Sequence, residues 1–539
     1  METKQQNNPY SNNTNQNYPY NSNVYPNNPY PAQPVAAVVK KEDSIYTKKI
    51  KEHFPFFGIG SALYALFYTF CLYRNASGIT YPFFVIGTLC FFFFSMQKLG
   101  VPYKTDSVFY IVSVVLLGIS NCLTNSGPLL FMNKCGIFLL TFILMTHTVY
   151  MDKNWNFPKY FAALAQMTGT VLTCVFRPFS DMVSYFDAQK QSKTGKKSYF
   201  IPILIGVAIT IPALLIMTVL LASADAVFSH MLDHLFSTIN FATIFGTGFL
   251  TIMVFFGSYA VNAAFSMKNV KEDVTNHRVF EPVTAIIVTA TLSVLYLMFS
   301  MIQILYLFIG KMQLPMGYTY SSYARQGFFQ LLTVCILNLI IVLICLYFFR
   351  ENTALKVILT IISGCTFIMI LSSALRMLMY INRYDLTFLR IFVLWALAVI
   401  FLLMAGVTIF IYMNRFPLFT YSMVIVTVFY IGLSFAHPDY WIARYNLDSA
   451  HMEYLDDYDR YDSKSYLGSL SADAAPILLN EETNPYLRQN MIDDEELAWL
   501  RRYRNKIDHL SKNMHVRNFN FSIYTAGKYV EWEKYWGDD

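Results

Sequence analysis

Residues 371–390 read Leu-Ser-Ser-Ala-Leu-Arg-Met-Leu-Met-Tyr-Ile-Asn-Arg-Tyr-Asp-Leu-Thr-Phe-Leu-Arg and join two long apolar runs. The first run contains Arg376, about one helical turn before Tyr380. Arg383, Asp385 and Arg390 precede the second run. A charge just inside a hydrophobic segment is costly unless it is paired or reaches the membrane interface. The stretch therefore predicts two membrane-spanning helices joined by a polar junction.

The composition of the whole chain favours a lipid bilayer as its solvent. Of 539 residues, 55% are hydrophobic and 14% are charged, whereas soluble domains carry about 25% charged residues. The net charge of +6 does not indicate nucleic-acid binding, because the basic residues lie in short loops between apolar runs. The eight cysteines lie in or beside apolar segments without CxxC spacing, so neither a metal nor another cofactor is expected.

The chain begins with two polar segments. Residues 1–39 are rich in Asn, Tyr, Pro and Gln, with too few aliphatic residues for a core, which predicts a disordered tail. Residues 40–53 form a basic juxtamembrane segment that contains Lys40, Lys41, Lys48, Lys49 and Lys51. Lysines ahead of a first span predict a cytoplasmic N-terminus.

Eleven apolar segments are long enough to cross a hydrocarbon core of about 30 Å, which takes roughly 17–25 helical residues. Four lie within residues 54–150 and seven within residues 200–436. The predicted spans are residues 54–73, 81–97, 106–122, 128–150, 200–222, 241–266, 282–309, 328–349, 355–380, 391–413 and 417–436. An odd number of spans and a cytoplasmic N-terminus predict an extracytoplasmic C-terminus in the cell membrane.

Residues 160–176 offer a twelfth span as an alternative. Their apolar residues recur at helical spacing and their polar residues take the opposite side, which is typical of a helix in the membrane interface. A span here would carry the lysines of residues 190–197 outside, against the charge rule. We therefore predict that residues 151–199 form a cytoplasmic loop with an interfacial amphipathic helix.

Residues 437–539 have the composition of a soluble, helix-rich C-terminal domain. A helix is predicted over residues 493–510, because acids lie at its start, bases follow, and apolar residues recur on one face. The alternation of Phe519, Phe521 and Ile523 indicates a short strand or an extended stretch. The fold class predicted for the whole chain is an all-α polytopic membrane protein with this small domain.

Polar residues gather where the later odd-numbered spans end and the even-numbered ones begin, so they share one membrane face. We call this group the polar rim, and acids and arginines are available in it to pair. Its members are Asp225, Gln303, Tyr306, Arg325, Arg376, Tyr380, Asp385, Arg390, Asp439 and Arg444. We interpret the rim as the surface on which the C-terminal domain docks.

Several motifs also carry a family resemblance. They are Ser-Ala-Asp-Ala-Val-Phe at residues 223–228, Gln303 with Tyr-Leu-Phe at 306–308, Tyr-Ala-Arg-Gln-Gly-Phe-Phe at 323–329, Ser-Ala-Leu-Arg-Met at 373–377, Tyr-Asp-Leu-Thr-Phe-Leu-Arg at 384–390 and Leu-Ser-Ala-Asp-Ala-Ala-Pro at 470–476. In this order, over residues 200–529, the chain resembles a bacterial membrane family known only as domain of unknown function 4173. Where family patterns have a glycine pair after Tyr-Leu-Phe, this chain has Ile309-Gly310. The resemblance implies an integral bacterial membrane protein and brings no catalytic residue.

Three functional hypotheses follow. No nucleophile–base pair, phosphate loop or metal-ligand spacing stands out, and no span carries an acid near its middle, which favours a non-enzymatic envelope sensor, scaffold or regulator. A transporter of a small or amphipathic solute is the second, because the chain has many spans and because Pro202 and Pro212 could break a helix. A membrane-embedded transferase at the outer rim is the third, and needs Asp225 or Arg376 in an open groove. The expected partners are the lipid bilayer and a protein bound through the C-terminal domain, without nucleic acid.

Overall fold

The computed structural model describes residues 44–153, 155–191, parts of 210–231, 240–272, 278–305, 320–448, 457–488 and 498–531. Within these residues the regular structure is helical and contains no strand. Phe280 and Phe349 form an isolated β-bridge. The contacts divide the chain after Asp43, and all of the described helices belong to the unit Ser44–Asp539. The predicted all-α class is confirmed.

Ten described helices are long and apolar enough to cross a bilayer, which confirms a multi-pass membrane protein. They are α2 (Phe54–Leu72), α3 (Thr80–Leu99), α4 (Val108–Leu123), α5 (Gly127–Val149), α10 (Phe241–Ser266), α11 (Pro282–Gln303), α12 (Tyr320–Phe348), α13 (Thr353–Tyr384), α14 (Phe388–Tyr412) and α15 (Leu418–Phe435). Each overlaps one predicted span. The remaining predicted span, residues 200–222, lies largely outside the described residues.

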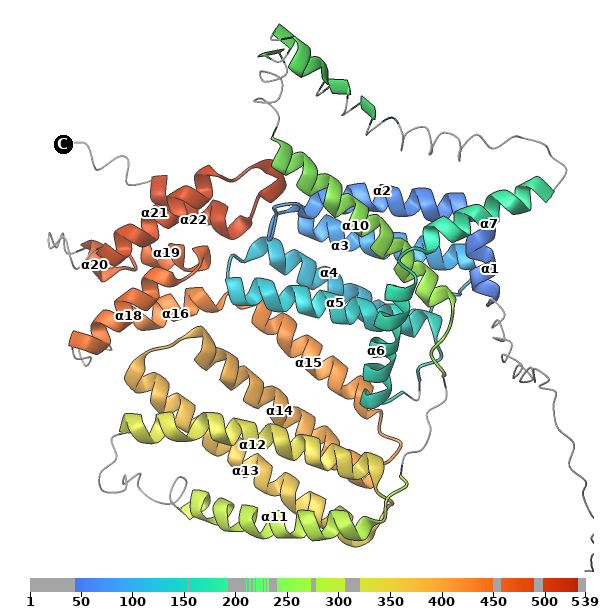
Figure 1. The fold of residues 1–539 in the computed structure, drawn as a ribbon. Helices are drawn as coiled ribbons and strands as arrows, with labels where there is room; N and C mark the ends of the chain where they lie inside the picture. Colours follow the sequence, from blue (N-terminus) through green and yellow to red (C-terminus); the bar gives the residue numbers. More distant parts are fainter. Residues whose placement is uncertain are drawn as a thin grey trace, which may run out of the picture. The chain divides into compact units, whose positions relative to one another are not determined.

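The spans pack as two sets that α15 connects (Figure 1). In the first set, α10, α2, α3, α4 and α5 contact one another in that order, and in the second α11, α12 and α14 surround α13. Leu117 and Leu144 are fully buried in the first set, as are Leu359 and Ile362 in the second. Large apolar side chains such as Phe245 stay exposed on the outside, as helices that face lipid require.

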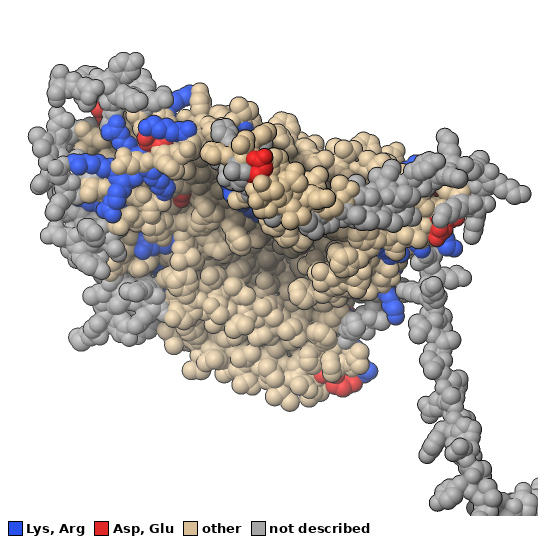
Figure 2. Space-filling model, turned by 45° about the horizontal axis from the view of Figure 1, so that its top comes forward, with Lys and Arg blue, Asp and Glu red and all other residues tan. Residues whose placement is uncertain are grey.

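The two ends of the spans contact different parts of the chain. At one end, α1 (Ile45–Glu52) contacts the last residues of α3 and α10, because Lys49 Nζ donates to the Leu99 carbonyl at 2.7 Å and Ser44 Oγ donates to the Ser266 carbonyl at 2.5 Å. We call this the α1 end. The C-terminal domain lies at the opposite end, which we call the domain end (Figure 1). In Figure 2, most visible lysine and arginine side chains lie over the C-terminal helices, beside an uncharged surface of the spans.

The C-terminal domain is built from short helices around its own core. They are α16 (Pro438–Asn446), α18 (Asp457–Ser469), η3 (Ala472–Ala474), α19 (Ala475–Leu478), α20 (Pro485–Arg488), α21 (Ala498–Lys512), η4 (Val516–Asn518) and α22 (Phe521–Glu531). Leu500, Tyr503 and Ile507 of α21 are buried in this core, which confirms the predicted apolar face.

The predicted short strand or extended stretch is wrong for Phe521 and Ile523, because a helix begins at Phe521. The Asn520 side-chain oxygen accepts the backbone N–H groups of Ser522 (3.0 Å) and Ile523 (3.2 Å). An asparagine in this role is an N-cap, which starts a helix by satisfying amides of its first turn. Three alternating residues were too short a pattern to indicate a strand.

Two further helices, α6 (Phe157–Thr173) and α7 (Arg177–Gln191), lie at the α1 end. The Tyr160 ring stacks on Phe419 at the start of α15, with centroids 4.1 Å apart. Near the other end of α6, Cys174 Sγ lies 3.7 Å from the sulfur of Met267, just after α10. Helix α6 therefore runs across the ends of α15 and α10 (Figure 1), and it is not among the ten candidate spans.

Candidate functional site

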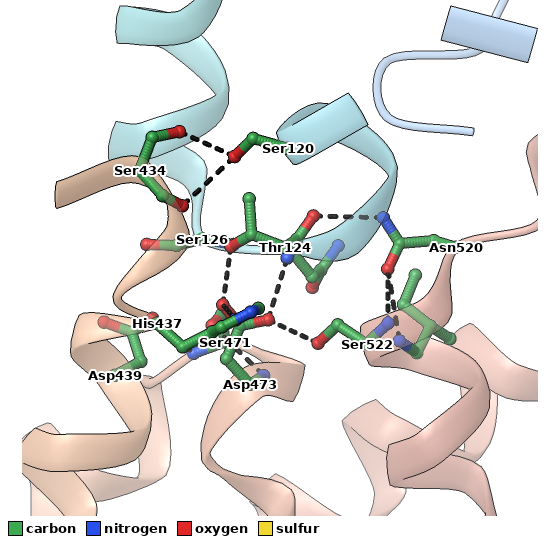
Figure 3. A network of polar contacts seen from close by, with 12 residues as sticks. Ser120, Thr124, Ser126, Ser434, His437, Asp439, Ser471, Asp473, Asn520 and Ser522 are labelled. Atoms are coloured by element: carbon green, nitrogen blue, oxygen red, sulfur yellow. Dashed lines mark hydrogen bonds and ion pairs between the residues drawn. The ribbon is translucent and has the colours of Figure 1, made fainter. Parts of the chain in front are cut away.

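The first group of polar contacts between the C-terminal domain and the spans centres on Asp473, a carboxylate in η3 whose side chain is fully buried (Figure 3). One oxygen, Oδ2, accepts from Thr124 Oγ1 at 2.5 Å and lies 3.2 Å from His437 Nδ1. The other, Oδ1, accepts from the Asn125 amide at 2.9 Å and from Ser522 Oγ. One side chain thus joins the α4–α5 loop, the start of α16 and the start of α22.

The charge of Asp473 is stabilised by these donors. Burial alone would raise the pKa of Asp473, but hydrogen bonds from His437, Ser522, Thr124 and Asn125 outweigh it and hold the pKa below its usual value. The hydrogen bond to Asp473 in turn raises the pKa of His437, against the opposing effect of burial. The geometry and these shifts favour an Asp473 carboxylate paired with a protonated His437.

A second buried carboxylate, Asp439, lies close by on α16. Its Oδ2 accepts the Ser471 amide at 3.2 Å, and burial, followed by the nearby charge of Asp473, raises the pKa of Asp439. Ser471 connects the two acids, because its hydroxyl accepts the Asp473 amide at 3.3 Å. The Ser471 carbonyl also accepts the Tyr503 hydroxyl at 2.7 Å, which ties the site to the domain core.

A second attachment joins the α2–α3 loop to the segment before α22. Asn75 Nδ2 donates to the Arg517 carbonyl at 3.1 Å, and the Ile79 amide donates to the Phe519 carbonyl at 2.7 Å. Asn520 Nδ2 donates to the carbonyls of Ser77 (2.9 Å) and Thr124 (3.0 Å), so it reaches two loops at once. Buried backbone groups of these loops find their partners in the C-terminal domain.

A third attachment joins the α13–α14 loop to α16 and α18. Asn446 is fully buried and forms a closed pair with Leu386, accepting its amide at 2.8 Å and donating to its carbonyl at 3.0 Å. The Phe388 amide donates to the Tyr466 hydroxyl at 2.9 Å. The C-terminal domain is thus bonded to three loops at the domain end.

Two residues of the predicted rim, Gln303 and Arg376, meet inside the second set of spans. Gln303 Oε1 accepts from Ser372 Oγ at 2.6 Å and from Arg376 Nη2 at 3.3 Å, and both Gln303 and Arg376 are buried. The guanidinium lies against Gly327 of α12, where a Cβ atom would overlap it. Arg376 therefore packs at a helix interface rather than in an open groove.

Three other rim residues shape the turn between α13 and α14. The Arg390 guanidinium lies 4.3 Å from the Tyr380 ring centroid and donates to the carbonyls of Tyr384 (2.5 Å) and Asp385. Asp385 is buried and has a φ of 70°, a positive value that is uncommon for a residue with a side chain. This group fixes the loop that Asn446 binds.

The remaining rim residues lie apart from these groups or outside the described part of the chain. Arg444 is exposed. Asp225 is also exposed, and its Oδ1 accepts the amides of Val227 (2.7 Å) and Phe228 (3.2 Å) within its own segment. Tyr306 and the side chain of Arg325 are outside the described residues. Of the predicted rim residues whose side chains the structure describes, only Asp439 belongs to the Asp473 site.

The chemistry of the Asp473 site is that of an attachment. Both carboxylate oxygens already accept hydrogen bonds from the protein. In the part of the chain that the structure describes, no three His, Cys, Asp or Glu side chains are grouped to hold a metal ion. A buried, fully bonded carboxylate fixes geometry, whereas a catalytic acid or nucleophile has to reach a substrate.

The fold and these attachments define a class, the polytopic α-helical membrane proteins with a docked C-terminal domain. Within that class, the chain belongs to the family described as Domain of unknown function (DUF4153), which matches residues 111–481. This family differs by name from the one that the motifs resemble, and its function is likewise unknown. No curated protein and no solved structure matches the chain.

Proposed function

We propose that this protein is a non-enzymatic scaffold, sensor or regulator of the cell envelope, whose C-terminal domain is held rigidly on the bundle and binds a protein partner. The observation that carries the proposal is the attachment of that domain to three loops by buried side chains, of which Asp473 has the most partners. A domain bonded at three points keeps a fixed position. A fixed position suits a docking platform or a device that reports on the bundle.

We further propose that the α1 end faces the cytoplasm and the C-terminal domain the opposite side of the cell membrane. Exposed lysines at the α1 end support this orientation through the positive-inside rule. They are Lys48, Lys98, Lys153 and Lys271. A reporter that works only in the cytoplasm is expected to be silent when fused after Asp539 and active when fused before Met1, and the reverse result would refute the orientation.

The functional proposal is tested by complementation of a strain that lacks the gene, under envelope stress. Asp473→Ala removes the main attachment, whereas Asp225→Asn changes an exposed acid that accepts amides of its own segment. A docked scaffold predicts that Asp473→Ala fails to complement at normal protein abundance and that Asp225→Asn complements fully. Loss of complementation with Asp225→Asn at normal abundance would instead support the transferase.

The two other hypotheses receive no support from the described residues. The transferase requires Arg376 or Asp225 in an open groove, and Arg376 is buried against Gly327. The transporter rests on the number of spans, which a scaffold shares, and on Pro202 and Pro212, which lie outside the described part of the chain. We therefore retain the scaffold as the function that the geometry supports best.

A further inference from the structure

We propose that α6 and α7 together form an in-plane anchor that binds phospholipids of the leaflet at the α1 end. Acyl chains would lie against an apolar flank of the two helices, independently of what the C-terminal domain does. This flank is made by Phe161 and Leu172 of α6, Phe176 in the turn that follows, and Phe179 and Val183 of α7.

The start of α6 is fixed to the bundle by a buried polar cluster. The Tyr160 hydroxyl donates to Asp152 Oδ2, and Asp152 also lies 2.8 Å from Nδ1 of His147 near the end of α5. Lys104 Nζ donates to the Tyr150 carbonyl at 2.7 Å, just beyond that helix. These contacts hold α6 across the helix ends, so the helix is part of the fold and not a loose loop.

Helix α7 is fixed at the level where the first span begins. The Tyr259 hydroxyl of α10 donates to the buried Asp181 at 3.0 Å, and Asp181 lies 3.7 Å from Arg177 Nε. The Tyr259 ring also contacts Phe54, the first residue of α2, with centroids 6.2 Å apart. Because Phe54 is where the first span starts, α7 lies at the boundary of the hydrocarbon core.

The side chains of α6 divide into three strips, as expected for a helix at an interface. Ala163 and Met167 are buried against the bundle, whereas Phe161 and Leu172 are 75% and 70% exposed. With 3.6 residues per turn, positions 161, 165, 168 and 172 of α6 fall on one flank, and positions 166, 170 and 173 fall on the other. The first flank is Phe, Ala, Thr and Leu, with the Thr168 hydroxyl bonded to the Leu164 carbonyl at 2.8 Å, and the second is Gln, Thr and Thr.

The apolar flank continues the lipid-facing surface of a span. Phe176 is 74% exposed, yet its ring lies 6.3 Å from Phe256 of α10, and Phe179 lies 5.6 Å from the same ring. The neighbouring Ile252 and Met253 of α10 are exposed side chains of a candidate span. A surface that is continuous with a lipid-facing helix is covered by the same lipid, and the exposed lysines at this end suit anionic headgroups.

The test is photo-crosslinking of the full chain in its native membrane. Phe161 and Phe176 are each replaced by p-benzoylphenylalanine, and Thr173 on the polar flank is replaced in the same way as the control. After irradiation, mass spectrometry of the purified protein is expected to find phospholipid adducts at positions 161 and 176, at least fivefold above position 173. Adducts to protein at both apolar positions, or equal lipid yields at all three positions, would overturn the proposal.

Elution of each variant as a single species in size-exclusion chromatography shows that it is folded. Should both phenylalanine variants fail to fold, Leu172 offers a third apolar position with the same expectation. Its yield is compared with that at position 173 in the same preparation. A Leu172 yield no higher than that of Thr173 would then refute the anchor.

Discussion

Replacement of Asp473 by asparagine is expected to loosen the whole C-terminal domain. The carboxylate has four partners, two on each oxygen. An asparagine keeps one of the two acceptor oxygens and replaces the other by an NH2 group, which then faces two hydrogen-bond donors. A buried donor without an acceptor costs about 1–3 kcal/mol. Two such losses, partly relieved by rotation of the hydroxyls, correspond to about 3 kcal/mol, or roughly a hundredfold in the equilibrium for opening.

Hydrogen exchange of single amides measures this opening, because protection reports the free energy needed to expose each group. The Asn125 amide reports the mutated attachment, and the Ile79 amide, bonded to the Phe519 carbonyl, reports the second one. If the attachments act together, both amides exchange roughly a hundred times faster in Asp473→Asn than in the unmodified protein.

The matched control is Asp508→Asn, which removes the same charge from the same domain. Asp508 forms an exposed pair with Lys512 at 2.6 Å, and pairs of this kind contribute about 0–1 kcal/mol. The control is expected to leave both amides protected. Exchange of Asn125 within threefold of the unmodified rate in Asp473→Asn would refute the reasoning, because the carboxylate would then contribute almost nothing to docking.

Three further perturbations test other contacts. Because the pKa of His437 is raised in the folded protein, the stability that His437 contributes is fully present below pH 6.5, its ordinary pKa, and is lost as the pH rises through the raised pKa. Protection of the Asn125 amide, corrected for intrinsic exchange, should therefore fall on the alkaline side. His437→Gln should remove this pH dependence. Gly327→Ala should cost about 1–3 kcal/mol, seen as a lower melting temperature in detergent, because the new methyl group displaces Arg376. Asn446→Ala should cost about 2–4 kcal/mol by leaving both backbone groups of Leu386 without partners, and should abolish protection of the Leu386 amide.

Further measurements separate the two acids and provide a control for the glycine substitution. In acid, the stability that Asp473 contributes is present above pH 3.8, its ordinary pKa, and is lost as the pH falls through the lower pKa that Asp473 has in the folded protein. Because the pKa of Asp439 is raised, its ionisation destabilises the folded protein as the pH rises. Asp439→Asn removes this effect, so the remaining pH dependence in acid is that of Asp473. For the glycine, Gly257→Ala adds a methyl group where no atom lies within 4 Å and should leave the melting temperature unchanged.

The spans were predictable from the sequence because a helix that faces lipid is apolar on all sides. Ten described helices overlap ten predicted segments, and charges in the loops marked where they end. The sequence also placed Gln303 and Arg376 together at one membrane face, since both lie near the ends of spans. What it did not provide was the partner of each group, because long-range pairing leaves no periodic signal in a single chain.

Asp473 shows why most of the site was missed. It stands in a recognisable phrase at residues 470–476, but the Thr124 side chain that it contacts is 349 residues away. Nothing near Thr124 in the sequence marks it as a ligand of a carboxylate. The helix at Phe521 could have been predicted, because Asn520 is a residue type favoured at N-caps.

The second attachment has a consequence for the order in which the protein is made. Asn75 and the Arg517 carbonyl that it binds are separated by 442 residues. At about 5–20 residues per second, the ribosome needs roughly 20–90 s to make the second partner after the first. During that time Asn75 can still donate to the Cys71 carbonyl and to Thr80, which lie within its own hairpin. The side-chain amide of Asn75 thus keeps two of its partners inside the α2–α3 hairpin before the C-terminal domain is made. The third partner, the Arg517 carbonyl, binds when that domain docks.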